Sequence, residues 1–127
     1  FIIGRGDRVK IIVLFLCILL VTGCNEKETL SEGQITGEQA QAYVEEGNTK
    51  LVDVRTDVEF DEGHIDGAIS IPMGTPKVMI ERMLKDKEER IIVYCRSGNR
   101  SHTFANELKE MGYTNVYDLG AMDNWNS

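Results

Sequence analysis

Apolar residues follow two kinds of pattern along most of the chain. One is a short apolar run bounded by polar residues, which is typical of a buried strand; such runs lie at 51–54, 68–71, 91–94 and 115–118. The other is helical spacing with a threonine cap pattern before it or a glycine after it; such segments lie at 36–47, 56–63 and 101–111. A further segment, 77–85, has mixed helical spacing. Because strand and helix alternate, the sequence predicts an α/β fold, a central and mostly parallel sheet with helices on both faces. Ligands of such sheets bind beyond the carboxyl ends of the strands.

The first two dozen residues have a different pattern. Residues 1–10 carry three basic side chains and one acidic side chain, and residues 11–22 carry no charge. This apolar run is shorter than the about 20 residues that span a bilayer. A basic segment followed by a short apolar one is typical of a secretory signal. A buried core helix is the alternative, and it is less favoured because the run has no polar face.

The apolar run ends at Val21–Cys24, which resembles the lipobox of bacterial lipoproteins. The resemblance implies cleavage before Cys24 and acylation of Cys24, and more than one acyl chain gives stable anchoring. We therefore expect a lipoprotein signal peptide at 1–23, the lipidated cysteine with a linker at 24–33, and one domain at 34–127. The expected location is outside the cytoplasm, with the protein exported and anchored by lipid to the membrane of the bacterial cell envelope.

Length, charge and cysteine content narrow the class of protein. The chain has 127 residues, which suits one domain, and a formal net charge of −7. This acidic balance lacks the basic footprint of nucleic-acid-binding proteins. Once Cys17 has left with the signal and Cys24 carries lipid, Cys95 is the one free thiol, so an intramolecular disulfide is excluded.

Neither a metal nor a cofactor is expected. Cys95 and His102 could both contact a metal, but two ligands do not make a zinc site. Met79 and Met83 could suggest a soft metal site, and we expect them to fill the core instead.

Cys95 lies at the end of the most apolar strand and directly before a helix. The loop between them, Arg96–Arg100, is polar, contains a glycine and carries two cations. Main-chain N–H groups in such a loop can converge on one point, and the helix that is expected from about Ser101 adds the positive end of its dipole. These features favour the thiolate, which is the nucleophilic form of cysteine. A cysteine that only fills space would instead have apolar neighbours.

Three motifs, in this order and at these separations, resemble those of the rhodanese homology domain. The first is Leu51–Pro72, whose matching positions are Asp53, Arg55, Glu59, Gly63, His64, Ile65, Gly67, Ala68 and Pro72. The second is the loop Cys95, Arg96, Ser97, Gly98, Asn99, Arg100 and Ser101. The third is Gly120–Met122, followed by Trp125. The resemblance spans about residues 34–126 and is closest to small, single-domain, exported rhodaneses.

The resemblance implies that the protein is a sulfurtransferase. Cys95 would attack the sulfane sulfur of a donor such as thiosulfate, become a persulfide, and pass the sulfur to a nucleophilic acceptor such as cyanide or a thiol. The loop Arg96–Ser101 would hold the anion through N–H groups. Arg96 would draw an anionic donor to the site, and Arg100 would either touch the anion or brace the loop. The implied partners are a small-molecule donor and acceptor, with a thiol-bearing protein as a further acceptor.

Four matching residues upstream of the loop are expected to support the architecture rather than to react: Asp53, Arg55, Glu59 and His64. Arg55 could pair with Glu59, four residues further on. His64 could act as a base near neutral pH, but we expect it to hold its turn by hydrogen bonds. Ala121 stands where the family often has a second glycine, and it would be strained at a positive φ.

Two other functions remain open. A reactive thiol without a resolving cysteine also suits a non-catalytic persulfide carrier or a redox-sensing module. A hydrolase of the same fold, similar to phosphatases or arsenate reductases, is less favoured because fold-related cell-cycle phosphatases have a longer loop than the four residues between Cys95 and Arg100. The narrower ring suits a single sulfur atom better than a phosphate.

Overall fold

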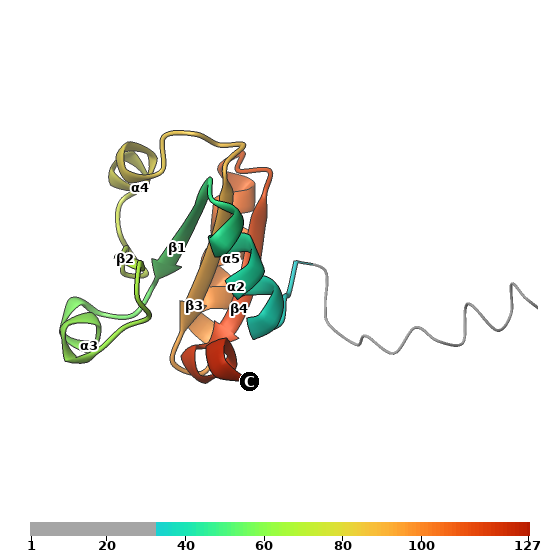
Figure 1. Cartoon of the computed structure of the whole chain (residues 1–127). Coiled ribbons are helices and arrows are strands. Elements are labelled where there is room, and N and C mark those ends of the chain that lie inside the picture. The colour runs from blue at the N-terminus through green and yellow to red at the C-terminus, as the bar shows by residue number, and fades with distance from the viewer. Residues whose placement is uncertain (1–32) are drawn as a thin grey trace, which may run out of the picture.

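The structure is a computed structural model that describes residues 33–127 (Figure 1). Its centre is a four-stranded sheet in the order β2-β1-β3-β4. The strands are β1 (Thr49–Asp53), β2 (Ile69–Ser70), β3 (Arg90–Cys95) and β4 (Val116–Ala121). All neighbouring strands pair in parallel, so their carboxyl ends lie at the same edge of the sheet. The expected signal peptide and Cys24 lie outside the described residues.

Helices cover both faces of this sheet. They are α2 (Gly37–Glu46), α3 (Asp57–Glu62), α4 (Lys77–Met83), α5 (Asn99–Glu110) and the 3-10 helix η1 (Met122–Asn126). Helices α2 and η1 lie over one face, and α5 lies over the other (Figure 1). The predicted α/β fold, with a parallel central sheet and helices on both faces, is confirmed. Within residues 33–127, none of these helices combines the length and apolar character that a membrane span requires.

The residues of β3 divide the core into two parts. Ile91, Val93 and Cys95 pack into the cluster that contains α4 and α5, whereas Ile92 and Tyr94 pack into the cluster that contains α2. Successive side chains of a strand point to opposite faces, which explains this division. All five side chains are fully buried. Cys95 is therefore the last side chain of the face that α5 covers, at the carboxyl edge of the sheet.

Several boundaries differ from those predicted from the sequence, and two of them stand out. Helix α5 begins at Asn99 rather than near Ser101, so Asn99 and Arg100 belong to its first turn. Strand β2 contains only Ile69 and Ser70, at the edge of the sheet. The loop around the sulfur is consequently shorter than the sequence suggested, and the helix start comes closer to Cys95.

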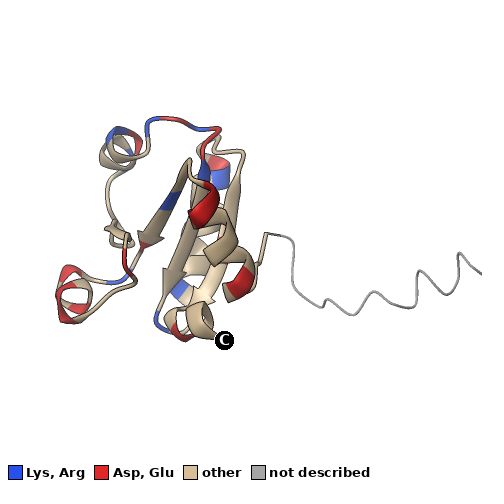
Figure 2. Ribbon diagram, viewed as in Figure 1, with Lys and Arg blue, Asp and Glu red and all other residues tan. Residues whose placement is uncertain are grey.

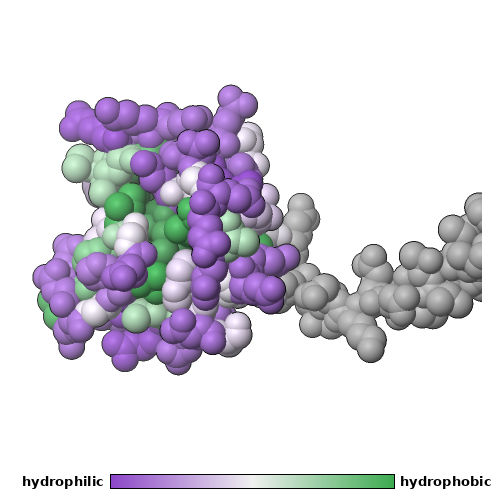
Figure 3. All heavy atoms as spheres, in the orientation of Figure 1, coloured by the Kyte–Doolittle hydropathy of each residue, from purple (hydrophilic) through white to green (hydrophobic). Residues whose placement is uncertain are grey.

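The prediction that Met79 and Met83 fill the core is wrong. They are 44% and 40% exposed, because Ile80 of α4 and Leu84 directly after it pack into the core and the methionines face outward. Figure 3 shows apolar surface on the side of the molecule that carries α3 and α4. The exposed large apolar side chains of the described chain all belong to these helices or to the segment between them: Val58, Met73, Val78, Met79 and Met83.

Candidate active site

The loop after β3 bends around the sulfur of Cys95. Gly98 precedes α5 with a φ of +106°, in the left-handed region that glycine enters without strain. The main-chain N–H of Gly98 donates to Sγ of Cys95 across 3.0 Å, and that of Ser101 donates across 3.4 Å. The side chain of Ser101 donates in turn to the carbonyl oxygen of Gly98 at 3.1 Å. The loop and the first turn of α5 together hold N–H groups against one sulfur atom.

Cys95 lies between two different environments. Its side chain is 0% exposed and belongs to the apolar cluster that contains Val54 and Phe104. On its other side are the N–H groups of the loop. The sulfur is therefore not enclosed by apolar atoms alone.

Burial and hydrogen bonding act on the Cys95 thiol in opposite directions. Burial alone would raise its pKa, because it penalises the charged form. The main chain and side chain of Ser101, and the main-chain N–H groups of Gly98 and Ser97, outweigh this effect and lower the pKa of Cys95 below its ordinary value. A larger share of the sulfur is therefore thiolate near neutral pH.

Glu59 of α3 binds both arginines of the loop. Its Oε1 and Oε2 accept hydrogen bonds from Nη1 and Nη2 of Arg100 at 2.8 and 3.1 Å. Its Oε2 also accepts one from Nε of Arg96 at 3.2 Å. The Arg100 guanidinium, together with the cap of α3, holds the pKa of Glu59 far below its usual range. Of the two roles considered for Arg100, this geometry is that of a brace between α5 and α3.

Arg55 does not form the expected pair with Glu59. It turns back to Asp53 instead, with Nη2 2.7 Å from Oδ2 and Nε 3.0 Å from Oδ1. Asp53 is 0% exposed, and a buried carboxylate is costly without a partner, whereas Glu59 is already bound by Arg100. Nη2 of Arg55 also donates to the carbonyl oxygen of Gly63 at 2.7 Å, so the pair ties the end of β1 to the turn after α3.

The two histidines lie outside the immediate surroundings of the sulfur. Nδ1 of His64 lies 2.9 Å from the carbonyl oxygen of Phe60, and the two rings stack with centroids 3.7 Å apart, which holds the turn after α3. Nδ1 of His102 lies 3.9 Å from Oδ2 of Asp118. In the part of the chain that the structure describes, no group of three or more His, Cys, Asp or Glu side chains could hold a metal ion.

The closing motif forms without the strain considered for Ala121. Gly120 has a φ of +83°, and Ala121 has a φ of −75° in an extended conformation. The glycine therefore occupies the left-handed position, and the alanine adopts a backbone that any residue tolerates. Trp125, from the same motif, packs against the cluster on the α2 face that contains Tyr94.

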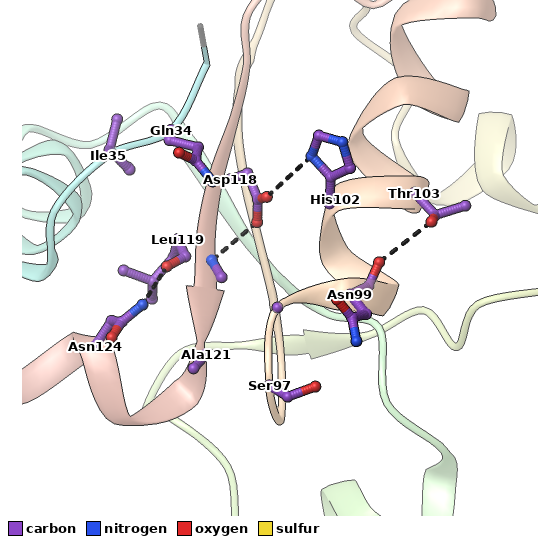
Figure 4. Close-up of a pocket in the computed structure, with 12 residues that line it drawn as sticks. Gln34, Ile35, Ser97, Asn99, His102, Thr103, Asp118, Leu119, Ala121 and Asn124 are labelled. Carbon is purple, nitrogen blue, oxygen red and sulfur yellow. Dashed lines mark hydrogen bonds and ion pairs between the residues drawn. The ribbon is translucent and has the colours of Figure 1, made fainter. Parts of the chain in front are cut away.

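A polar cavity of about 730 Å³ lies beside the loop, between the start of α5 and the end of β4 (Figure 4). The loop contributes residues 97–99 to its wall, and Asp118 faces His102 across part of it (Figure 4). Cys95 and the two loop arginines are not among its lining residues. The loop therefore contacts α3 through its two arginines, and it borders this cavity through residues 97–99.

Sequence reasoning missed the contact between Glu59 and the loop. The spacing of Thr56 and Glu59 is that of a capping box, which the structure forms, and this local pattern accounts for the residue without a distant partner. Arg100 lies 41 residues further along the chain. The signal that could have found the contact is electrostatic: two cations in a short loop need an acidic partner, and the loop itself contains none.

Comparisons with known proteins agree with this geometry. The model of the rhodanese-like domain family matches residues 36–127. Thiosulfate sulfurtransferase PspE of Escherichia coli is 37% identical over 71 residues, which are 56% of this chain and 68% of PspE. A tRNA uridine(34) hydroxylase of Sodalis glossinidius is 30% identical over 89 residues, which are 67% of this chain but only 25% of the hydroxylase.

A solved structure supports the same assignment. It is a rhodanese with anions from Escherichia coli, 34% identical to this chain, with a TM-score of 0.57 over 60% of this chain and 89% of that one. The family model covers nearly all of the described residues and includes the loop around Cys95. The chain therefore belongs to the rhodanese-like domain family.

Proposed function

We propose that this protein is a sulfurtransferase that carries sulfane sulfur on Cys95. The observation that supports this most directly is the pair of main-chain N–H groups, from Gly98 and Ser101, that donate to Sγ. Groups that stabilise a thiolate at this point also suit the anionic outer sulfur of a persulfide. The name of the relative PspE, thiosulfate sulfurtransferase, supports thiosulfate as the class of donor.

The proposed reaction has two steps. In the first, the Cys95 thiolate attacks the sulfane sulfur of thiosulfate; a new S–S bond forms, the S–S bond of the donor breaks, and sulfite leaves with the electron pair. In the second, cyanide or a thiolate attacks the outer sulfur. The persulfide S–S bond then breaks, thiocyanate or an acceptor persulfide leaves, and Cys95 returns to the thiolate. Atoms and charges balance without a further reactant or a cofactor.

The burial of Cys95 also suits a persulfide intermediate. Its side chain has no exposed surface, so bulk water has little access to the sulfur. Excluding water strengthens the hydrogen bonds that hold the anion and limits side reactions. The persulfide would therefore persist until an acceptor arrives.

Arg96 is the proposed cation for an anionic donor. Its side chain is 71% exposed and makes one hydrogen bond to Glu59, whereas the Arg100 side chain is 35% exposed and directs two nitrogens to Glu59. A donor that approaches from solvent meets Arg96 first. In this proposal Arg100 braces the loop instead of binding the donor.

Steady-state kinetics test the proposed activity. With thiosulfate as donor and cyanide as acceptor, we expect thiocyanate to form with the parallel double-reciprocal lines of a ping-pong reaction, and Cys95→Ser to abolish it. Slow thiocyanate formation with fast sulfur exchange to a thiol would favour the persulfide carrier instead. Turnover of an aryl phosphate that depends on Cys95, without sulfur transfer, would contradict the proposal.

We further propose that the domain is exported and anchored by lipid on Cys24 to the bacterial cell envelope. The support comes from the sequence: a basic segment, an uncharged run at 11–22 and a lipobox-like end at Val21–Cys24. The family model begins at residue 36, which leaves only a short stretch between Cys24 and the domain. Any protein acceptor of the sulfur would then be encountered at the membrane surface.

A further inference from the structure

Glu59 is placed between α3 and the loop by contacts on both sides. From its own helix, its Oε1 accepts hydrogen bonds from the main-chain N and the Oγ1 of Thr56, both at 3.1 Å. From the loop, it accepts hydrogen bonds from Arg100 and Arg96. Its side chain is 16% exposed. Because the cap already orders this carboxylate, little further side-chain entropy is lost when it binds the arginines.

The other acidic residues of α3 do not share this contact. Asp57, Asp61 and Glu62 are exposed, and no ion pair joins them to the loop arginines in the described part of the chain. Figure 2 shows the acidic positions of α3 in red. Among the acidic residues of α3, Glu59 is therefore the one that accepts hydrogen bonds from the loop arginines.

The charges at the loop do not cancel completely. One carboxylate faces two guanidinium groups, and Arg100 receives most of its hydrogen bonds. Among these three side chains one positive charge therefore remains, and it is centred on the more exposed Arg96. Arg55 lies nearby as a further cation, but its own charge is compensated by Asp53.

We propose that Glu59 is a positioning residue that sets the charge met by a sulfur donor: it retains Arg100, leaves Arg96 for the donor, and so limits the attraction of anions to Cys95. This inference rests on the proposed sulfurtransferase function and adds donor selection to it. The Cys95 sulfur is among the groups that raise the pKa of Arg100, so Glu59 and Cys95 act on the same guanidinium. Glu59 would therefore restrain the attraction of a doubly charged donor more than that of a singly charged one.

The substitution Glu59→Gln separates charge from shape. Glutamine keeps an oxygen that can accept from Thr56 and Arg100, but it releases one positive charge toward the donor. We expect the KM for thiosulfate, with two charges, to fall about fivefold at low ionic strength, since Coulomb attraction grows with the product of the charges. For benzenethiosulfonate, with one charge, the expected fall is about the square root of that factor, roughly twofold. Both effects should shrink in high salt.

Alkylation of Cys95 tests the inference without sulfur transfer. Iodoacetate and iodoacetamide differ mainly in one negative charge, and the rate of each is followed on the Cys95 peptide of the full chain by mass spectrometry. We expect the ratio of the iodoacetate rate to the iodoacetamide rate to rise about twofold in Glu59→Gln. The matched control is Glu62→Gln, which removes an exposed charge of the same helix and should leave the ratio unchanged.

Each outcome decides the inference. A rise in the ratio that is confined to Glu59→Gln and lost in high salt supports it; no rise, or an equal rise in Glu62→Gln, overturns it. If Glu59→Gln fails to fold, Arg96→Gln is used, and a ratio that does not fall below the wild-type value overturns the inference. If the ratio behaves as expected but thiosulfate never loads Cys95, the proposed function fails while the charge-setting role of Glu59 stands.

Discussion

Single residues decide the state of the sulfur. Cys95 is fully buried, which by itself favours the neutral thiol, yet N–H groups from Ser101 and Gly98 reach its Sγ and favour the thiolate. The second effect is the larger one, so the pKa of Cys95 is lowered. The position of each donor depends on the left-handed backbone of Gly98 and on the early start of α5.

The lowered pKa predicts an unusual pH profile for Cys95. The rate of its alkylation by iodoacetamide, measured from pH 5 to 10 on the Cys95 peptide, should reach half-maximum at a lower pH in the folded protein than in the same chain in urea. Because the pKa of Cys95 is lower in the folded than in the unfolded state, the thiolate stabilises the folded state. This contribution is fully present above the pKa of the unfolded chain and is lost as the pH falls through the pKa of the folded protein. A folded midpoint at or above the unfolded one would contradict the hydrogen-bond geometry.

Gly98→Ala tests the loop backbone. An added Cβ would meet its nearest atom, Cα of Gly120, at 3.7 Å, which is ordinary contact, so the cost comes from the φ of +106°. We expect about 1–2 kcal/mol of strain, a displaced N–H, and at least tenfold slower sulfur loading of Cys95. Gly47→Ala is the control, because Gly47 has a φ of +87° with no atom within 4 Å of the added Cβ and lies far from the loop in sequence. Equal losses of activity in both variants would argue against a specific role for Gly98.

At the scale of elements, the turn after β1 and helix α3 form the support of the site. The buried pair of Asp53 and Arg55 fixes the end of β1 and reaches the turn at Gly63. Helix α3 has no buried residue of its own, so its capping box and its contact with Arg100 hold it in place. The acidic helix is therefore held to the molecule mainly by polar contacts.

The substitution Asp53→Asn tests how much the pair of Asp53 and Arg55 contributes to the free energy of unfolding. Removing one partner of a buried ion pair leaves the other charge uncompensated, and we expect a loss of about 3 kcal/mol in the free energy of unfolding. Urea denaturation of the wild type and the variant measures this difference. A loss below about 1 kcal/mol, which is the range of exposed ion pairs, would show that the pair does not stabilise the turn after α3.

Local patterns predicted the elements well, and distant contacts explain what they missed. The capping boxes that begin at Thr36 and Thr56 each depend on only four consecutive residues, and both are present in the structure. The start of α5 was missed because its cap is Gly98, which has no side chain to signal a helix start. The pair of Arg55 with Asp53 depends on burial, and the pair of Glu59 with Arg100 depends on long-range packing, and spacing along the chain contains neither kind of information.

At the scale of the whole molecule, alternation of strands and helices was sufficient to predict the fold class. The loop Cys95–Ser101 was also singled out from the sequence, because a buried strand followed by polar residues and a helix is a local signal. The order of the strands was not predicted, since it depends on contacts between segments far apart in the sequence, and the exposure of Met79 and Met83 contradicts the prediction that they fill the core.

The proposed lipid anchor predicts where the protein fractionates in a bacterial host. Labelled palmitate should be incorporated into the wild type, which should sediment with membranes, because two or more acyl chains give stable binding. Cys24→Ser should lose the label and at least nine tenths of the membrane-bound protein. Cys17→Ser, a change within the expected signal peptide, should retain both. A wild type without label would contradict the anchor.

The central claim is that Cys95 holds a transferable sulfur, and intact-mass spectrometry after incubation with thiosulfate tests it most directly. The account predicts a gain of one sulfur atom on Cys95, its loss when cyanide is added with release of thiocyanate, and no gain in Cys95→Ser. An unchanged mass of the folded wild-type protein with thiosulfate, and with other sulfane donors, would contradict the account.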